Sequence, residues 1–227
     1  MTIRSEDDEM IELYSGPLSM FGAKAEIAVL EKGIACQRTF VPFSLATLYE
    51  PTHAVVARVN PKGQVPVLVD GDLEIFDSTQ IFEYLEDIQP KPALWPAEPR
   101  QRARARQLEL LSDEVFFPNV ITLMPRARAA AGEEGVRAAH AAIDRFYVAR
   151  DAGLGDVPYL AETFSYADIA FFMAQFFAGF LGRPIPATLM RLSAWRRRVG
   201  ERETVRAVAG AMAEYLRTNG VPVPDAA

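Results

Sequence analysis

The stretch from Asn60 to Ser78 constrains the fold more than any other part of the chain. It begins with Asn-Pro-Lys-Gly at 60–63, which predicts a turn because proline fixes φ and glycine tolerates positive φ. Two short apolar runs follow, and the Asp-Gly-Asp between them at 70–72 is typical of a tight β-hairpin. Asp77 and Ser78 then precede an amphipathic segment at 80–88, and both residue types start helices.

Pro66 is the unusual residue of this stretch, because it stands where a strand normally needs a backbone N–H. A cis Val65–Pro66 bond would turn the Val65 main chain outward and leave it open to a ligand. The alternative is a trans proline that opens an edge strand. The local sequence favours the trans bond, since only about 5–6% of such bonds are cis in folded proteins.

The first ninety residues follow the order of a mixed α/β sheet. Strands are predicted at 11–14 and 35–42, with a helix at 20–32 between them that ends at Gly33. Residues 45–57 are ambiguous and predict at most a loose helix interrupted by Pro51. A βαβ unit requires a parallel strand pair, and the hairpin adds two more strands. The pattern therefore predicts a thioredoxin-like, four-stranded mixed sheet with helices on both faces.

A proline-rich segment separates this part from the rest of the chain. Residues 89–99 contain four prolines, which oppose both helix and sheet. We expect an N-terminal thioredoxin-like domain at 1–89, a linker at 90–99 held to the core by Leu94 and Trp95, and an all-α helical bundle domain at 100–227. The fold class is thus α/β plus all-α.

The C-terminal domain is predicted to be helical throughout. A capping box of Ser165 and Asp168 opens its most apolar helix. The expected helices are 101–117, ending at Pro118, then 119–131, bent near Pro125, 133–150, 169–181, 189–199 and 204–217.

Composition excludes several functional classes. The net charge of −6 argues against a nucleic-acid surface, and the arginine runs at 100–106 and 191–206 fit solvated helix faces better than interaction patches. Cys36 is the single cysteine, which fits a reducing compartment. We expect no metal site. The acidic N-terminus is unlike a signal peptide, and the apolar run 169–181 is too short to span a bilayer. We therefore expect a cytoplasmic protein that binds neither membrane nor nucleic acid.

The pattern N-P-x-G-x-V-P-x-L, followed by a hairpin, Asp-Ser and a helix, resembles the glutathione-binding half of the glutathione S-transferase family. Leu13 to Ser15, Ser19 and 30–33 resemble the first βα unit of its bacterial members, and 159–170 and Trp195 resemble their helical domain. The resemblance extends over about two hundred residues. It implies a cis bond at Pro66.

The resemblance also implies glutathione as co-substrate and a serine as its activator. The glutathione thiol has a pKa of about 8.5, so the enzyme must stabilise the thiolate. A hydroxyl at a helix N-terminus can do so. Ser19 is placed in this way, although Met20 follows it where many relatives have proline. Ser15 is a second candidate, and either serine can instead serve as a cap or turn residue.

The remaining binding residues follow from the same resemblance. Asp77 and Ser78 would hold the γ-glutamyl end of glutathione, with Ser78 also capping the helix. The main chain of Val65, before Pro66, would pair with the cysteinyl part. His53 is the candidate contact for the glycine carboxylate.

The contact for the glycine carboxylate and one set of apolar residues leave alternatives open. Arg58 and Lys62 compete with His53, which can also be an ordinary surface residue. An apolar electrophile would bind between the domains. The side chains that can line such a cleft, at least half of them expected in the core, are Phe116, Phe117, Met124, Phe172, Phe176 and Phe177.

Two functions remain. The first is a homodimeric, detoxifying glutathione transferase that conjugates glutathione to an apolar electrophile, with ether cleavage, dehalogenation and isomerisation as variants. The dimer would use the hairpin-to-helix surface and the helix at 100–117. The second is a non-catalytic regulator of the stringent-starvation type, which binds RNA polymerase. The segment Leu-Tyr-Ser-Gly-Pro at 13–17 resembles the opening loop of such regulators. Ser19, Val65, Pro66, Asp77 and Ser78 together favour the enzyme.

Overall fold

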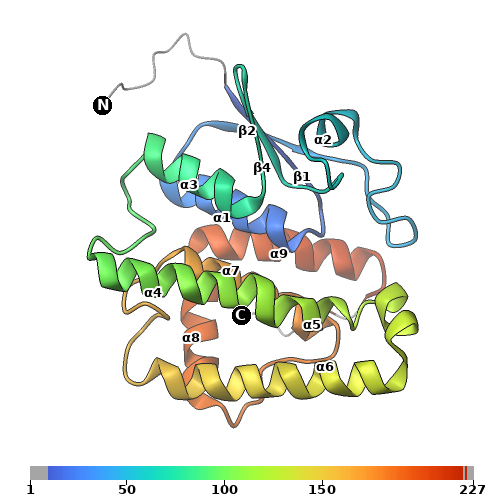
Figure 1. Ribbon diagram of the computed structural model, residues 1–227, viewed down its shortest axis with the longest axis vertical. Coiled ribbons are helices and arrows are strands. Elements are labelled where there is room, and N and C mark those ends of the chain that lie inside the picture. Colours follow the sequence, from blue (N-terminus) through green and yellow to red (C-terminus); the bar gives the residue numbers. More distant parts are fainter. Residues whose placement is uncertain (1–9, 222, 224–227) are drawn as a thin grey trace. The chain divides into compact units, whose positions relative to one another are not determined.

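The computed structural model describes residues 10–221 and residue 223 and divides into two compact units (Figure 1). The N-terminal unit extends to Pro92 and the C-terminal unit begins at Ala93, so the predicted linker at 90–99 spans their boundary. The acidic N-terminal segment 1–9, on which the expectation of no signal peptide rests, lies outside the described residues. None of the described helices has both the length and the apolar character needed to cross a bilayer.

The N-terminal unit contains the predicted four-stranded mixed sheet, with strand order β2-β1-β3-β4. Strands β1 and β2 are parallel, whereas β3 pairs antiparallel with both β1 and β4. Gly71 has a φ of 60°, which suits a glycine in the tight hairpin between β3 and β4. The strands are β1 (Ile11–Ser15), β2 (Cys36–Phe40), β3 (Val67–Asp70) and β4 (Leu73–Phe76).

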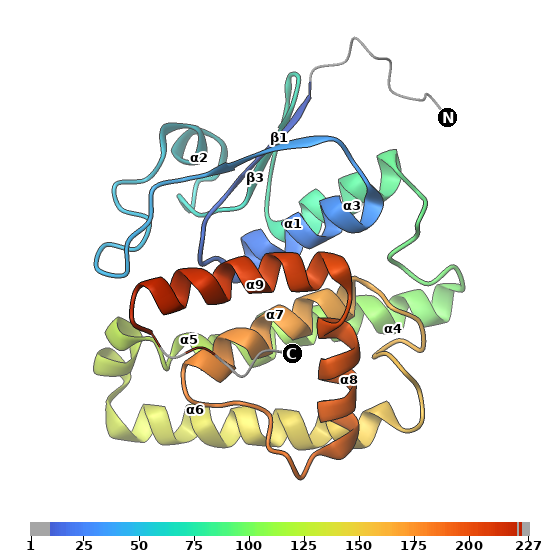
Figure 2. The same ribbon diagram turned by 180° about the vertical axis from the view of Figure 1, so that it is seen from behind.

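Helices flank the sheet on two sides. Helices α1 (Met20–Lys32) and α3 (Ser78–Ile88) pack side by side, as both views show (Figures 1 and 2). The short helix α2 (Ala54–Val59) lies apart from them and places Val56 in a buried cluster with residues of β3. The ambiguous segment 45–57 therefore forms turns first and a helix only at its end.

Helix α1 is buried on more sides than its sequence predicts. Lys24 and Glu26 are buried, whereas the apolar Leu30 is 46% exposed. At the end of the helix, buried Lys32 pairs with Glu86 and donates hydrogen bonds to two backbone carbonyl oxygens beyond α3. Buried charged residues therefore help to fix the position of α1 against α3 and the segment that follows it.

The C-terminal unit is built around one central helix, α7. Its residues from Tyr166 to Ala178 are all buried, and it packs against α4, η1, α5, α8 and α9. Trp95 packs edge-on against Tyr166 with 5.9 Å between ring centroids, as expected of a linker residue held to the core. The elements are α4 (Pro99–Leu110), η1 (Leu111–Phe116), α5 (Phe117–Ile121), α6 (Pro125–Leu154), α7 (Tyr166–Phe180), α8 (Met190–Gly200) and α9 (Glu203–Thr218).

The prediction that the first long helix ends at Pro118 is wrong. The helix passes through the π-helical turn η1 and continues in α5 to Ile121. In an α-helix the proline ring would clash with the carbonyl four residues earlier, but Glu114 lies in the wider turn with i→i+5 bonding. Gly132, with φ 65° and ψ −177°, breaks α6 where the sequence predicts separate helices.

Candidate functional site

The register of the sheet brings three candidate segments to the same end of its strands. Strand β1 ends at Ser15, and its neighbour Tyr14 pairs with Val67 at the start of β3. Val67 in turn pairs with Phe76 at the end of β4. The loop before α1, the Val65–Pro66 peptide and the Asp77–Ser78 junction therefore meet at the same end of the sheet.

Ser19 is the N-cap of α1, and its backbone has the extended conformation that capping requires. Its Oγ accepts a hydrogen bond from the Gly22 N–H at 3.0 Å, so the hydroxyl hydrogen remains able to donate. The first turn of α1 contains no acidic residue. The positive end of the helix dipole is thus uncompensated and favours an anion beside Ser19.

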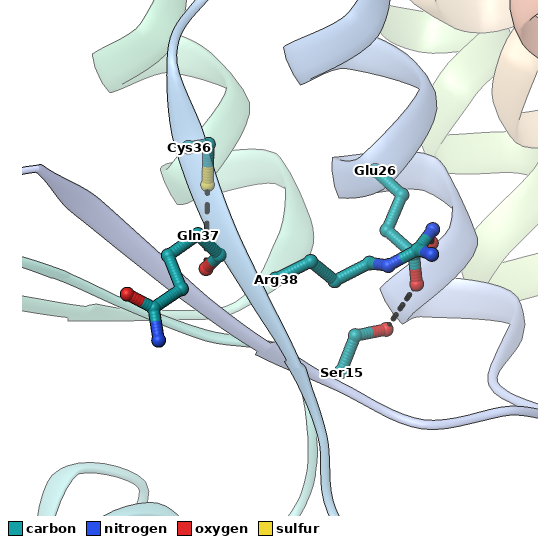
Figure 3. A network of polar contacts seen from close by, with 5 residues as sticks. All are labelled: Ser15, Glu26, Cys36, Gln37 and Arg38. Carbon is teal, nitrogen blue, oxygen red and sulfur yellow. Dashed lines mark hydrogen bonds and ion pairs between the residues drawn. The ribbon is translucent and has the colours of Figure 1, made fainter.

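Ser15 is held in a different way, by a buried carboxylate. The Ser15 side chain is completely buried, and its Oγ donates to Glu26 Oε1 at 2.6 Å. Figure 3 shows Arg38 reaching from β2 toward the same carboxylate, where its Nη1 donates to Glu26 Oε2 at 2.8 Å. Burial raises the pKa of Glu26, while the hydrogen bond from Ser15 and the charge of Arg38 oppose the rise. The Ser15 hydrogen is therefore already committed, whereas that of Ser19 is not.

Sequence reasoning missed Glu26, although a signal was present. Glu26 lies three residues after Ala23 and directly before Ile27, two apolar residues that are both buried. A charged residue on a buried stripe needs a partner. Arg38, on the neighbouring strand of the predicted sheet, supplies it.

Glycine is required at position 22 in the first turn of α1, because a side chain there would meet the Ser15 hydroxyl. A methyl group at Gly22 would lie 2.2 Å from Ser15 Oγ and 3.0 Å from Ser19 Oγ. Both hydroxyls thus border the same first turn of α1. Cys36 is half-buried on the outer strand β2, with its Sγ 3.8 Å from the Gln37 carbonyl oxygen (Figure 3).

The Val65–Pro66 peptide bond is cis, as the resemblance implied and contrary to what the local sequence favours. The Val65 side chain is buried in a cluster with Val41, Val56 and Val67. Among the described residues, no protein group hydrogen-bonds to the Val65 main chain. Buried backbone groups are nearly always paired, so this peptide offers a donor and an acceptor to a ligand.

Asp77, and not Ser78 as expected, caps α3. Its Oδ1 accepts hydrogen bonds from the N–H groups of Thr79 at 3.0 Å and Gln80 at 3.2 Å. A cap needs a non-helical backbone, and Asp77 has φ 76° whereas Ser78 is already the first residue of the helix. Positive φ is rare outside glycine, and such residues cluster at functional sites.

Asp77 keeps one carboxylate oxygen available. The side chain is exposed, and within the described part of the chain its Oδ2 has no hydrogen-bond partner. Ser78 is buried, with 2% of its surface exposed, at the N-terminus of α3. The junction therefore combines an unpaired carboxylate oxygen with a helix N-terminus, the two groups that bind an ammonium and a carboxylate.

The three basic candidates differ in how they are engaged. Arg58 forms an ion pair with Glu74 of β4. His53 precedes α2 and lies 5.4 Å from the Tyr14 ring, and its buried Nδ1 has no hydrogen-bond partner among the described residues. The main-chain N–H of Lys62 donates to the Asn60 side chain, which shapes the predicted turn, and the Lys62 side chain is exposed. His53 and Lys62 are thus better placed than Arg58 to bind an anion.

Most of the aromatic residues considered for an apolar cleft belong to the core. Phe116 packs edge-on against Phe171, and Phe117 packs against Phe177 in the same way. Met124 is the one of the six that is not buried. The five buried phenylalanines, each at most 5% exposed, are Phe116, Phe117, Phe172, Phe176 and Phe177.

Comparison with known proteins agrees with this geometry. Residues 13–93 match the family model described as glutathione S-transferase, N-terminal domain. A solved glutathione S-transferase from Rhodospirillum rubrum is 25% identical to the chain, with a TM-score of 0.75 over 88% of this chain and 92% of that one.

Two curated bacterial proteins match a shorter part of the chain. A stringent starvation protein A homolog of Coxiella burnetii is 33% identical over 108 residues, which are 48% of this chain and 49% of that protein. The GST-like protein YibF of Escherichia coli is 35% identical over 124 residues, 54% of this chain and 57% of that protein. The chain thus spans about half the length of these curated relatives.

Proposed function

Because this chain belongs to the glutathione S-transferase family, we propose that it is a serine-type transferase that conjugates glutathione to an apolar electrophile. The observation that carries the proposal is the set of unengaged groups at one end of the sheet. These are the Ser19 hydroxyl hydrogen, the Val65 main chain and one oxygen of Asp77. Each matches a different part of a γ-linked, thiol-bearing tripeptide.

In this proposal Ser19 stabilises the glutathione thiolate. The thiol loses its proton to solvent, and the Ser19 Oγ–H donates a hydrogen bond to the sulfur while its Oγ still accepts from Gly22. The α1 dipole adds to the stabilisation of the anion. The thiolate then attacks the electrophilic carbon, the sulfur–carbon bond forms, and the leaving group departs with its electron pair.

The tripeptide would be held by groups around the sulfur. The Val65 main chain pairs with the cysteinyl residue, Asp77 Oδ2 accepts from the γ-glutamyl ammonium, and the N-terminus of α3 at Ser78 takes the adjacent carboxylate. His53 or Lys62 binds the glycine carboxylate. The buried Glu26 carboxylate accepts a hydrogen bond from Ser15 at the start of the loop and pairs with the exposed Arg38 side chain.

Calorimetric titration with glutathione, followed by turnover of a model aryl halide, tests this function. Ser19→Ala should retain binding and lower kcat by about 10²-fold, the usual effect of removing one donor to a developing anion. Ser15→Ala is the matched control, because it removes a neighbouring hydroxyl that already donates to Glu26. It should lower stability and leave thiolate formation intact. Full activity of Ser19→Ala would remove that residue from its role.

A non-catalytic regulator is the second candidate, and the similarity to stringent starvation protein A homologs favours it. Such a regulator would bind RNA polymerase in place of glutathione. The absence of heat with millimolar glutathione, together with capture of purified RNA polymerase, would support the regulator over the transferase.

We also propose a cytoplasmic homodimer. The outer strand β4 exposes Leu73 at 41% and Phe76 at 36%, and α4 exposes Leu110 at 54%. Apolar side chains on an edge strand favour association with another chain. Light scattering should give twice the mass of 25.1 kDa. A monomer mass would contradict the proposal.

A further inference from the structure

A pocket inside the C-terminal unit has no part in the glutathione site. It lies between α4, the start of η1, the C-terminal end of α6 and the segment 157–162, and its volume is about 350 Å³. Figure 1 shows the end of α6 and the start of α4 on the same side of this unit. Small-molecule sites have volumes of about 300–1,000 Å³, so the pocket is large enough for an organic ligand.

The polar lining of the pocket is rich in hydrogen-bond donors. Arg104 and Arg150 both line it, and in the described chain neither forms an ion pair or a hydrogen bond. Glu162 is the only acidic residue of the described lining, and it accepts a hydrogen bond from Gln101 Nε2 at 3.1 Å. Two guanidinium groups, which donate and never accept, thus share the lining with one carboxylate that already accepts a hydrogen bond.

Arg150 is held in place without a polar partner. Its guanidinium lies 5.3 Å from the ring centroid of Phe146, one helical turn earlier in α6. Its Nε is buried, with no acceptor among the described residues. Burial lowers the pKa of Arg150 from its ordinary value. A buried donor left unpaired in a native structure indicates a missing partner, and an anionic ligand would supply one.

Apart from Gln107, the rest of the lining is apolar, and it favours an anion that carries an organic group. Leu108, Leu111 and Leu154 form part of the wall, so a bare inorganic ion would leave apolar surface in water. A carboxylate can be satisfied by one arginine, whereas a phosphate monoester carries nearly two charges and three acceptor oxygens. We propose that this pocket binds a small organic phosphate monoester, with its phosphate on Arg104 and Arg150 and its organic group against the leucines.

Isothermal titration of the full chain with phenyl phosphate tests the proposal. We expect saturable binding that weakens with salt, with inorganic phosphate and benzoate each binding at least about tenfold more weakly. Arg104→Met and Arg150→Met keep most of the side-chain length and should each weaken phenyl phosphate binding at least about tenfold. Arg145→Met, on the exposed face of the same helix, is the matched control and should bind like wild type.

A pocket-filling variant separates loss of the site from loss of the fold. A side chain at Gly153, which lines the pocket, meets no atom within 4 Å at its first carbon. Gly153→Leu should therefore fold normally, retain glutathione binding and lose phenyl phosphate binding. The proposal is overturned if phenyl phosphate does not bind at millimolar concentration, if Arg150→Met binds it unchanged, or if benzoate binds equally well.

Discussion

Each unit of the molecule has an aspartate that accepts backbone N–H groups at the start of a helix. Asp77 is the N-cap of α3, whereas Asp168 is the third residue of α7 and completes a capping box with Ser165. Asp168 near the start of α7 is fully buried and uses both carboxylate oxygens. Its Oδ1 accepts from the Leu160 N–H and from Trp195 Nε1, both 2.8–2.9 Å away, and its Oδ2 accepts from the N–H and hydroxyl of Ser165. Asp77 before α3 is exposed, uses one oxygen and has a positive φ.

This difference separates a structural cap from a cap available to a ligand. A carboxylate with four buried donors has no capacity left, and its role is to hold α7, the 157–162 segment and α8 together. A carboxylate with one oxygen directed elsewhere, on a strained backbone, retains capacity for a further donor. The burial of an aspartate side chain and the number of its carboxylate oxygens already hydrogen-bonded therefore predict its function better than the capping motif does. In both units the sequence shows only an aspartate at the start of a helix.

The largest expected effect is the loss of stability in Asp168→Ala. Four donors lose their common acceptor in the interior, which should lower the free energy of unfolding of the C-terminal unit by about 4 kcal/mol. Urea denaturation followed by tryptophan fluorescence reports on this unit, because both tryptophans, Trp95 and Trp195, lie in it. Asp77→Ala should cost the N-terminal unit only about 1 kcal/mol, the usual value of a cap. Equal losses in the two variants would break the comparison.

The next largest expected effect is a pH dependence of stability that comes from the buried Asp168. Burial raises the pKa of Asp168 to about 6 from 3.8, against the opposing hydrogen bonds from Leu160, Trp195 and Ser165. Between these values the folded state keeps a proton that the unfolded state has released. The free energy of unfolding should therefore fall as pH rises from about 4 to 6, by about 3 kcal/mol in total, and then level off.

Asp168→Asn provides the reference for that measurement. Subtracting its urea stability from that of wild type at each pH isolates the titration of Asp168 from that of other carboxylates. A difference that stays constant from pH 4 to 7 would contradict the raised pKa.

Much of the fold could be predicted because its signals are local. The helix 20–32 ends at Gly33, which has φ 62°, and the hairpin turns at Gly71, as the residue types require. The capping box of Ser165 and Asp168 is present as predicted. The end of the helix was predicted wrongly at Pro118 because a proline normally ends an α-helix. No local sequence pattern predicts the π-helical turn that accommodates this proline.

The site was less predictable because its decisive features depend on contacts distant in sequence. The Asp-Ser pair offers two adjacent caps, and only the backbone, with positive φ at Asp77, shows which one is used. The Ser15–Glu26 hydrogen bond joins the end of a strand to the middle of a helix. The pocket around Arg150 joins segments about fifty residues apart and left no motif.

The smallest change, Asp77→Asn, tests the ligand side of the comparison. Asparagine keeps one oxygen for the N–H groups of Thr79 and Gln80, so the stability of the N-terminal unit should fall by less than about 1 kcal/mol. The negative charge proposed to meet the γ-glutamyl ammonium is lost. Glutathione affinity, measured by calorimetry, should therefore fall about tenfold or more, because charge-assisted hydrogen bonds contribute about 1.5–3 kcal/mol.

A glutathione analogue without the α-amino group completes a double-mutant cycle with Asp77→Asn. Wild type should bind the analogue about as weakly as Asp77→Asn binds glutathione, and the variant should lose little further affinity for it. Independent, additive losses would mean that Asp77 does not contact the ammonium. Its unpaired oxygen and positive φ would then be features of the α3 cap alone, and Asp77 would be as purely structural as Asp168.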